Sequence, residues 1–304
     1  MIVTSVSFII PVYNKSKFLK PVIKSIKSQK GKFKKEYIFI DDGSTDDSYR
    51  ILKQETKGMR NCQIVKQRNK GSANATNQGI KIAKMKYIKF LDADDLILSD
   101  STKLLVDILE KNSGCILAYG LQRKVKNIVN VNLNERINNY EIEIIDKPIN
   151  LAMRNSMFNP SQFLVKTSFC KSVGGCDERI KFSQEYSLTL KLSKIGPFVK
   201  LNYPIAILPY SAPGQISEKK NNQIFRVSKA LELFINDNND LPIKTMLYAQ
   251  RRLTARAWRF ARNNKIKKFY LKYFFLYLIG LLRINFKLLK VCAQANKIYE
   301  PFLD

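Results

Sequence analysis

Short apolar runs alternate with amphipathic segments along the first hundred residues. The apolar runs are typical of buried strands, and the amphipathic segments repeat their apolar side chains at the spacing of a helix. The predicted strands are residues 6–10, 36–40, 62–65 and 87–91, and the predicted helices are residues 17–30, 46–57 and 72–85. Strands that alternate with helices form right-handed βαβ units, so we expect an α/β fold with a mainly parallel sheet flanked by helices.

A polar cluster follows the carboxyl end of each predicted strand. The clusters are Tyr13-Asn14, Asp41-Asp42, Arg68-Asn69 and Asp92 to Asp95. In sheets of this kind, ligands bind in the crevice outside the carboxyl ends of the strands. Four separate segments of the chain therefore point to one binding site.

The pattern divides the chain into two parts. Residues 121–149 predict an irregular excursion, followed by a strand at 162–165 and a helix at 186–195, and basic helices begin after residue 220. We expect a domain at residues 1–220, made of the halves 1–96 and 97–220, and a basic, aromatic-rich helical extension at 221–304.

Charge and composition narrow the function classes. The 304 residues carry a formal net charge of +28, which favours phosphorylated substrates, anionic lipid surfaces or nucleic acid as partners. The absence of histidine excludes Ser-His-Asp and Cys-His pairs and every His-ligated metal site. Five scattered cysteines without a C-x-x-C pair predict reduced, mostly buried thiols and a cytoplasmic protein. The first residues predict a strand rather than an export signal.

The strongest chemical signal is the acidic cluster Asp92-Ala93-Asp94-Asp95. Three carboxylates in four residues repel one another unless a cation or hydrogen-bond donors compensate them. Mg²⁺ and Mn²⁺ prefer oxygen ligands and often bind through one or two carboxylates together with substrate phosphates. The alternative is structural, because Asp94 and Asp95 could cap a helix over residues 96–111.

Taken together and in order, four motifs resemble the family 2 glycosyltransferases. They are the stretches V-S-F-I-I-P-V-Y-N at residues 6–14, F-I-D-D-G-S-T-D at 39–46, N-K-G at 69–71 with A-T-N-Q-G at 75–79, and Y-I-K-F-L-D-A-D-D at 87–95. A weaker match continues through residues 174–178 and 184–188. The resemblance implies a GT-A (Rossmann-like) fold whose first half binds a nucleotide-sugar donor and whose second half binds the acceptor.

The resemblance also implies roles for individual residues. The backbone of Pro11, Val12 and Tyr13 and the side chain of Asp41 or Asp42 would hold the base and ribose of the donor. We expect a UDP-linked donor, with dTDP- and GDP-sugars as the alternatives. The other donor-binding positions would be Asn14, Asn69, Gly71, Asn77, Asp92 and Ala93. Mg²⁺ or Mn²⁺ would bridge the diphosphate and Asp92 and Asp94, with Asp94 the direct ligand and Asp95 close by. The sugar would then move with inversion to a hydroxyl of a glycan or lipid-linked acceptor, in polysaccharide or lipopolysaccharide biosynthesis.

The resemblance places the general base at Glu185, where family members more often have aspartate. A carboxylate at a helix N-terminus stays ionised readily, which suits a base, although the same position suits a capping residue. Thr76 stands where members often carry arginine, with Arg68 and Lys70 as candidate substitutes. These departures leave open a non-catalytic relative that binds nucleotide sugar. The aromatic residues Phe158, Phe182 and Tyr186 could face the acceptor sugar, although such residues more often lie in the core.

The C-terminal extension has a chemistry of its own. Arginines recur at helical spacing over residues 251–262, and an aromatic run follows at 269–282. Between Lys272 and Arg283 lie about ten uncharged residues, roughly 15 Å of helix, which is too short to cross a hydrocarbon core of about 30 Å. Residues 251–290 therefore predict either an interfacial helix, peripheral on the anionic inner face of a membrane, or a helix packed on the main domain. Nucleic-acid binding is the competing interpretation of the charge, but no motif of a nucleic-acid-binding module accompanies it.

Overall fold

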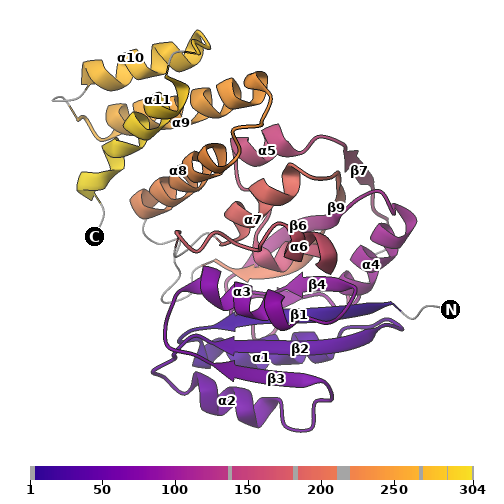
Figure 1. Ribbon diagram of the computed structural model, residues 1–304. Helices are drawn as coiled ribbons and strands as arrows, with labels where there is room; N and C mark the ends of the chain where they lie inside the picture. The colour runs from indigo at the N-terminus through magenta and orange to yellow at the C-terminus, as the bar shows by residue number, and fades with distance from the viewer. Residues whose placement is uncertain are drawn as a thin grey trace.

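The computed structural model describes residues 4–135, 139–180, 184–210, 220–266, 270–285 and 287–302. Within these ranges the chain forms a central sheet with helices on both faces and a helical layer added at its C-terminal end (Figure 1). The strand order is β3-β2-β1-β4-β8-β6-β9-β5, and β7 pairs with β9 outside this path.

The first half of the sheet is parallel, as the sequence predicts. Its strands are β1 (Ser5–Val12), β2 (Lys34–Asp41), β3 (Cys62–Lys66) and β4 (Tyr87–Phe90). β1 pairs in parallel with both β2 and β4, and β2 pairs in parallel with β3. The connecting helices are α1 (Ser16–Lys27), α2 (Ser48–Glu55) and α3 (Ser72–Ile82). Three crossover connections therefore bring the carboxyl ends of these strands to one edge of the sheet.

The second half makes the sheet mixed. Its strands are β5 (Leu96–Ile97), β6 (Leu117–Val125), β7 (Ile142–Ile145), β8 (Phe163–Lys166) and β9 (Phe198–Pro209). β8 lies between β4 and β6 and is antiparallel to both, while β6 and β9 pair in parallel. β5 and β7 are antiparallel to β9. The expectation of a mainly parallel sheet thus holds for the donor half proposed above, and the antiparallel additions come from elements with weak sequence patterns.

Alternation along the strands separates two cores. Phe8 and Ile10 of β1 face one side, where they pack with α1 and with α4 (Ser101–Lys111). Ile9 faces the other side, where α3, α6 (Thr167–Ser172) and α7 (Gln184–Ser193) cover the sheet. Gly79 of α3 packs directly on Ile9, since a Cβ at this glycine would lie 2.3 Å from Ile9 Cγ2. That close approach fixes α3 against β1.

Three expectations need correction or completion. The helix expected at residues 96–111 begins only at Ser101, because Leu96 and Ile97 pair with β9 as β5. Phe158 and Tyr186, candidates for the acceptor pocket, are buried in the core, with exposed fractions of 3% and 0%. Phe182 lies outside the described residues. The cysteines are free, and except for the half-buried Cys62 they are buried, as expected.

The C-terminal extension is a helical bundle that packs on the main domain. Its helices are α8 (Lys220–Asp237), α9 (Ile243–Asn263), α10 (Tyr270–Leu281) and α11 (Leu288–Asn296). Figure 1 shows it beyond α5 (Ile149–Arg154) and α7, on their side away from the sheet. Arg252 and Arg256 of α9 donate to the carbonyls at the end of α5, including Arg154 O at 2.7 and 3.2 Å. Within the described ranges, every helix is too short or too polar to cross a bilayer.

Candidate active site

The polar clusters predicted from the sequence do meet at one edge of the sheet. Strand register sets Val12 at the end of β1 beside Asp41 at the end of β2, and Phe90 at the end of β4 beside Ile9. The acidic cluster begins at Asp92, two residues after Phe90. The convergence expected from the alternation of strands and helices is therefore confirmed.

Asp42 and Asp41 have different environments. Asp42 Oδ1 accepts hydrogen bonds from Gln67 Nε2 at 2.7 Å and from the Lys70 backbone N–H at 2.9 Å, and its Oδ2 accepts from the Gly71 N–H at 2.9 Å. These bonds hold the loop after β3 against β2. Asp41 is also buried, but its Oδ2 has no hydrogen-bond partner in the described structure. Asp41 thus has a buried acceptor oxygen that the surrounding protein leaves without a partner.

Asn14 ties the ends of β1 and β2 together. Its backbone has φ 51°, a left-handed conformation that asparagine tolerates better than most residues. Its Oδ1 accepts from the Thr45 N–H at 2.8 Å, and its own N–H donates to Ser44 Oγ at 3.1 Å. Next to it, Tyr13 is 47% exposed, so its ring is available at the rim. Asn14 therefore shapes the loop, and Tyr13 presents a surface to a ligand.

The loop between β3 and α3 holds further candidate donor-binding positions. Gly71 precedes α3 with φ 90° and is buried beside Asp42, whereas Asn69 is exposed. Asn77 turns toward the second half of the chain: its Oδ1 accepts from the Cys176 N–H at 2.8 Å, and its Nδ2 donates to Glu178 Oε1 at 2.8 Å. The geometry thus favours a structural role for Asn77, whereas Asn69 lies exposed at the surface.

The acidic cluster is held by Ser161, which the sequence analysis missed. Ser161 Oγ donates to Asp95 Oδ2 at 2.6 Å and accepts from the Asp92 N–H at 3.0 Å. The ammonium of Lys89, buried beneath the cluster, donates to Ser161 O at 2.5 Å. Burial lowers the pKa of Lys89 to about 7, although Asp95 and Asp92 oppose that shift. Asp95 therefore has a fixed partner, and a buried lysine that loses its proton readily lies close to the carboxylates.

Asp94 has a second partner that the sequence analysis missed. Lys15 Nζ lies 2.6 Å from Asp94 Oδ2, and both side chains are largely buried, with exposed fractions of 16% and 12%. The two residues follow β1 and β4, which are neighbours in the sheet. No helix N-terminus lies at Asp94 and Asp95, because α4 begins at Ser101. The capping alternative for these two carboxylates is therefore wrong.

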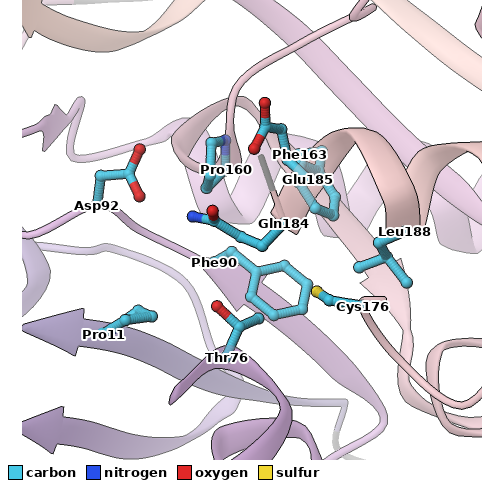
Figure 2. A pocket seen from close by; sticks show the side chains of 10 residues that line it. All are labelled: Pro11, Thr76, Phe90, Asp92, Pro160, Phe163, Cys176, Gln184, Glu185 and Leu188. Carbon is cyan, nitrogen blue, oxygen red and sulfur yellow. The ribbon is translucent and has the colours of Figure 1, made fainter. Parts of the chain in front are cut away.

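Asp92 and Glu185 line the same narrow cavity (Figure 2). The other lining residues are Pro11, Thr76, Phe90, Pro160, Phe163, Cys176, Gln184 and Leu188. Burial is the main cause that raises the pKa of Glu185 to about 7, while the backbone N–H groups of Glu185 and Tyr186 lower it. The expectation that the helix N-terminus keeps this carboxylate readily ionised is therefore wrong, because desolvation outweighs these two hydrogen bonds. Burial, and then the negative charges of Asp94 and Glu185, raise the pKa of Asp92 to about 8. Two carboxyl groups from separate halves of the chain thus share one weakly solvated space.

The carboxylates of this site could hold a divalent cation only if a bound ligand supplied further oxygen atoms. Carboxylate oxygens suit Mg²⁺ and Mn²⁺. Within the described part of the chain, however, no group of three or more His, Cys, Asp or Glu side chains converges to hold a metal. Asp95 is bound to Ser161 and Asp94 to the ammonium of Lys15, so a cation would bind Asp92 together with Asp94 only by taking the place of Lys15. A cation held by these two would need further oxygen atoms, which a diphosphate carries.

Signals for the missed residues were weak in the sequence. Lys15, Lys89 and Ser161 are common residue types, and Ser161 follows Asp92 by 69 positions. Lys89 alone gave a usable hint, because a lysine in the middle of an apolar strand requires buried partners. The pairing of β4 with β8, which brings Ser161 to the site, could not be read from residue spacing.

Comparison with known proteins places the chain in a family. Residues 7–169 match the family model "Glycosyl transferase family 2". The chondroitin synthase of Escherichia coli is 29% identical over 200 residues, which are 65% of this chain and 28% of that protein. An uncharacterized glycosyltransferase of Rickettsia conorii is 41% identical over 110 residues, or 36% of this chain and 18% of that protein. The chain therefore spans less than a third of the length of these two relatives.

Solved structures share the fold at low sequence identity. S. aureus TarS 1–349 in complex with UDP-GlcNAc has a TM-score of 0.69 and 14% identity, covering 98% of this chain and 91% of that chain. The mannosyltransferase PcManGT from Pyrobaculum calidifontis, in complex with GDP-Man and Mn²⁺, has a TM-score of 0.58 and 15% identity, covering 97% and 87%. These matches confirm the expected fold. The family model covers more than half of the chain, and the chain belongs to glycosyl transferase family 2.

Proposed function

We propose that this chain transfers a sugar from a nucleotide-diphosphate sugar to a hydroxyl group of a glycan or lipid-linked acceptor, with inversion at the anomeric carbon. The observation that carries the proposal is the cavity that Asp92 shares with Glu185. One carboxylate lies on the donor side of the sheet, and the other begins the helix of the second half. An inverting displacement needs these two functions on opposite sides of the reacting carbon, namely charge stabilisation at the leaving group and a base at the acceptor.

The base and ribose of the donor would lie against the ends of β1 and β2. Asp41 supports this assignment, because its buried Oδ2 lacks a partner and would accept a hydrogen bond from an N–H group of the base. Asp42 would act indirectly by holding Gly71 and the loop around Asn69. The exposed ring of Tyr13 offers a stacking surface. TarS has been solved with UDP and with UDP-GlcNAc, which favours a UDP-linked donor here.

Asp92 and Asp94 would hold Mg²⁺ or Mn²⁺ together with the diphosphate. When bound, the cation would stabilise negative charge on the leaving nucleoside diphosphate. Asp94 already binds a positive charge, the ammonium of Lys15, so a divalent cation would take over a carboxylate that is organised for a cation. Ser161 would keep Asp95 and the Asp92 backbone in place. PcManGT, a structural neighbour, was solved with GDP-Man and Mn²⁺.

Glu185 would remove the proton from the acceptor hydroxyl. Its raised pKa of about 7 suits a base that operates near neutral pH, since proton transfer is most effective when the pKa of the base lies near the working pH. Gln184 beside it is bound by Ser72 Oγ at 2.8 Å, which links the start of α7 to the start of α3. The base is therefore held relative to the donor half of the chain.

The acceptor would be presented at an anionic membrane surface by residues 251–290. Part of this region packs inward, since Arg252 and Arg256 bind α5. α10 is different: its apolar side chains Leu271 and Phe275 are 71% and 60% exposed, and Leu282, just after the helix, is 67% exposed. The exposed basic residues Arg262, Lys265, Lys272, Arg283 and Lys290 lie in or around it. An apolar helix face with a basic border is suited to the interface of an anionic bilayer. This would make the protein peripheral on the cytoplasmic face.

Two alternatives make different predictions. A non-catalytic relative would bind nucleotide sugar without turnover, and a nucleic-acid-binding protein would bind RNA in a salt-sensitive manner without a preference for nucleotide sugars. The acidic edge of the sheet favours a cation with a diphosphate over bare nucleic acid.

The test is a thermal-shift screen of nucleotide sugars with and without Mn²⁺, on the wild type and on Asp94→Ala. A ligand that binds only the folded state raises the Tm according to its concentration relative to its Kd. We expect a Mn²⁺-dependent rise with a UDP-sugar in the wild type and none in the variant. Absence of a rise with every UDP-, GDP- and dTDP-sugar, against a rise with RNA alone, would contradict the proposal.

A further inference from the structure

The segment from Gly174 to Ile180 touches three parts of the molecule. On the donor side, Asn77 of α3 binds both the N–H and the C=O of Cys176, at 2.8 and 3.0 Å. Gly175, with φ +65°, packs so closely on Asn77 that a Cβ would lie 2.4 Å from its Oδ1. Glu178 accepts hydrogen bonds from Asn74 and Asn77. The segment is thus fixed to the helix that follows the donor loop.

The same segment is bound to the helix that begins with the proposed base. The Asp177 N–H donates to Ser187 Oγ at 3.0 Å, and Ser187 Oγ donates to Gln184 O at 3.0 Å. Lys191, one turn further along α7, donates to Gly175 O at 2.9 Å. The contacts therefore hold α7 at Ser187, close to Glu185, and at Lys191 in its last turn.

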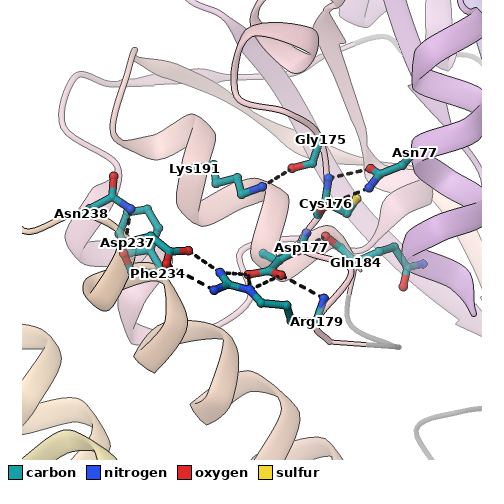
Figure 3. A network of polar contacts seen from close by, with 11 residues as sticks. Asn77, Gly175, Cys176, Asp177, Arg179, Gln184, Lys191, Phe234, Asp237 and Asn238 are labelled. Carbon is teal, nitrogen blue, oxygen red and sulfur yellow. Dashed lines mark hydrogen bonds and ion pairs between the residues drawn. The ribbon is translucent and has the colours of Figure 1, made fainter. Parts of the chain in front are cut away.

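The third part is the C-terminal bundle, reached through Arg179 (Figure 3). Arg179 binds Asp177 through Nε at 2.9 Å and through Nη2 at 2.7 Å. Its Nη1 lies 3.3 Å from Asp237 Oδ1, and its Nη2 also binds Asp237 Oδ2. Asp237 is the last residue of α8. One guanidinium thus joins the bundle to the segment that holds the start of α7.

Packing shows why α7 responds to the bundle. Leu188 and Leu192 of α7 belong to the core under the sheet, while Tyr186 and Leu190 belong to the core shared with α8 and α9. The helix is therefore buried between two layers, and its position is set by both. Glu185 lies at the end of this helix that faces the cavity.

We propose that Arg179 is a positioning residue, through which the C-terminal bundle holds the first turn of α7 and the base Glu185 in register with the donor half. The role assigned to Glu185 rests on the function proposed above. The coupling itself rests on the Asp177–Arg179–Asp237 contacts. It makes the bundle part of the machinery that aligns the two halves of the site, in addition to any surface it offers to a membrane.

A matched control exists in the same interface. Lys194, just after α7, binds Asp240 after α8 at 2.8 Å. This ion pair also joins α7 to the bundle, but it does not contact the segment from Gly174 to Ile180. Loss of general bundle packing would follow from either substitution, whereas loss of positioning at Glu185 would follow only from a change at Arg179.

Hydrogen exchange on the full chain tests the coupling without any ligand. We expect Arg179→Met to speed exchange of the amides in the first turns of α7 by about tenfold, because local opening there becomes easier. Lys194→Met should leave these amides unchanged, and Arg179→Lys should give an intermediate rate, since an ammonium cannot bind two carboxylates as a fork. If Arg179→Met does not fold, Asp237→Asn takes its place, because it keeps the pair with Asp177 and removes only the charge on the bundle side. Unchanged exchange in the variant, or an equal change in Lys194→Met, would overturn the inference.

Kinetics test the consequence for the base. With UDP-GlcNAc and Mn²⁺, and water as acceptor, Arg179→Met should lower kcat about tenfold or more while KM for the donor stays within about twofold, because misplacement of the base affects the chemical step. A raised KM at unchanged kcat would assign Arg179 to donor binding and overturn the positioning role. Failure of the wild type to bind any nucleotide sugar would refute the proposed function, whereas the exchange measurement would still decide the coupling.

Discussion

The ammonium of Lys15 lies 2.6 Å from the carboxylate of Asp94, although 79 positions separate the two residues in the sequence. Neighbouring strands β1 and β4 bring them together. Both side chains are largely shielded from water, so the pair is stronger than an exposed ion pair and more costly to break. The acidic cluster is therefore organised around a positive charge by the protein alone.

Lys15→Met should destabilise the protein by about 1–3 kcal/mol, because it leaves the buried carboxylate of Asp94 without its partner. Mn²⁺ with UDP should then raise the Tm of the variant more than that of the wild type, since the cation no longer competes with the ammonium. Thermal unfolding with and without Mn²⁺ and UDP measures both effects.

Lys30→Met serves as the control for this change. Its pair with Asp100 has the same charges but is more exposed, with fractions of 52% and 31%. Its loss should cost less than about 1 kcal/mol and leave the effect of Mn²⁺ unchanged. Equal responses of the two variants would show that Lys15 has no special relation to the cation site.

Glu185→Gln should lower the rate of transfer by about 10²–10⁴-fold, the usual contribution of a general base. In the wild type the rate should rise as pH increases through about 7, where Glu185 loses its proton. An activity that falls over the same interval would exclude Glu185 as the base.

Glu185→Gln should lower activity but raise the stability of the folded protein above neutral pH. The folded state holds the Glu185 proton more tightly than the unfolded state, so this group destabilises the protein as pH rises from 4.5 through about 7. Glutamine removes that penalty. The variant should therefore melt a few degrees above the wild type at pH 8 and at about the same temperature at pH 4, as measured by calorimetry.

Asp41→Asn and Asp42→Asn should separate binding from stability. The change at Asp41 removes the free carboxylate oxygen, so we expect UDP binding to weaken about tenfold or more while the Tm changes little. Asp42→Asn disturbs the bonds to the Lys70 and Gly71 backbone and should destabilise the protein by about 1–3 kcal/mol. Calorimetric titration with UDP and thermal unfolding of both variants provide the comparison. If both variants bind UDP as tightly as the wild type, the nucleotide does not bind at this edge of the sheet.

Leu271→Ser combined with Phe275→Ser should abolish flotation with anionic liposomes, because it removes two exposed apolar side chains from α10. Ile243→Ser, which changes a side chain that is 50% exposed at the start of α9, is the matched control and should float like the wild type. Binding to neutral liposomes equal to that with anionic ones would contradict the role of the basic border.

The donor half of the fold could be predicted because its signals are local. β1 and β2 each contain a continuous apolar run, β4 is apolar except for Lys89, and β3 is the weakest of the four. A polar cluster at or just after the carboxyl end of each strand marks the edge of the sheet. The helix expected after Asp95 shows where local signals fail: Leu96 and Ile97 fit a helical pattern, but pairing with β9 makes them a strand. Leu96 and Ile97 form a strand rather than a helical turn because they pair with Ile207 and Ala206, more than a hundred positions away.

The residues of the candidate site likewise divide into those that local sequence predicts and those that only tertiary pairing reveals. Asp92 and Asp94 could be proposed because their sequence context is specific, and Glu185 because of a weaker match. Ser161 and Lys15 depend on tertiary pairing that no spacing reveals. The distinction between Asp41 and Asp42 also needed the structure, because it depends on which carboxylate the loop after β3 has already bound. The roles of these residues in catalysis stay predictions.

The position of β8 between β4 and β6 has a consequence for how the protein is made. β4 ends at Phe90, but the strand that covers its open edge begins only at Phe163. During synthesis at about 5–20 residues per second, the nascent chain therefore exposes an unpaired strand edge for several seconds after the parallel half has emerged. Fragments that end between these two strands should aggregate or recruit chaperones, and the ribosome-bound chain should become resistant to protease only after β8 has left the exit tunnel.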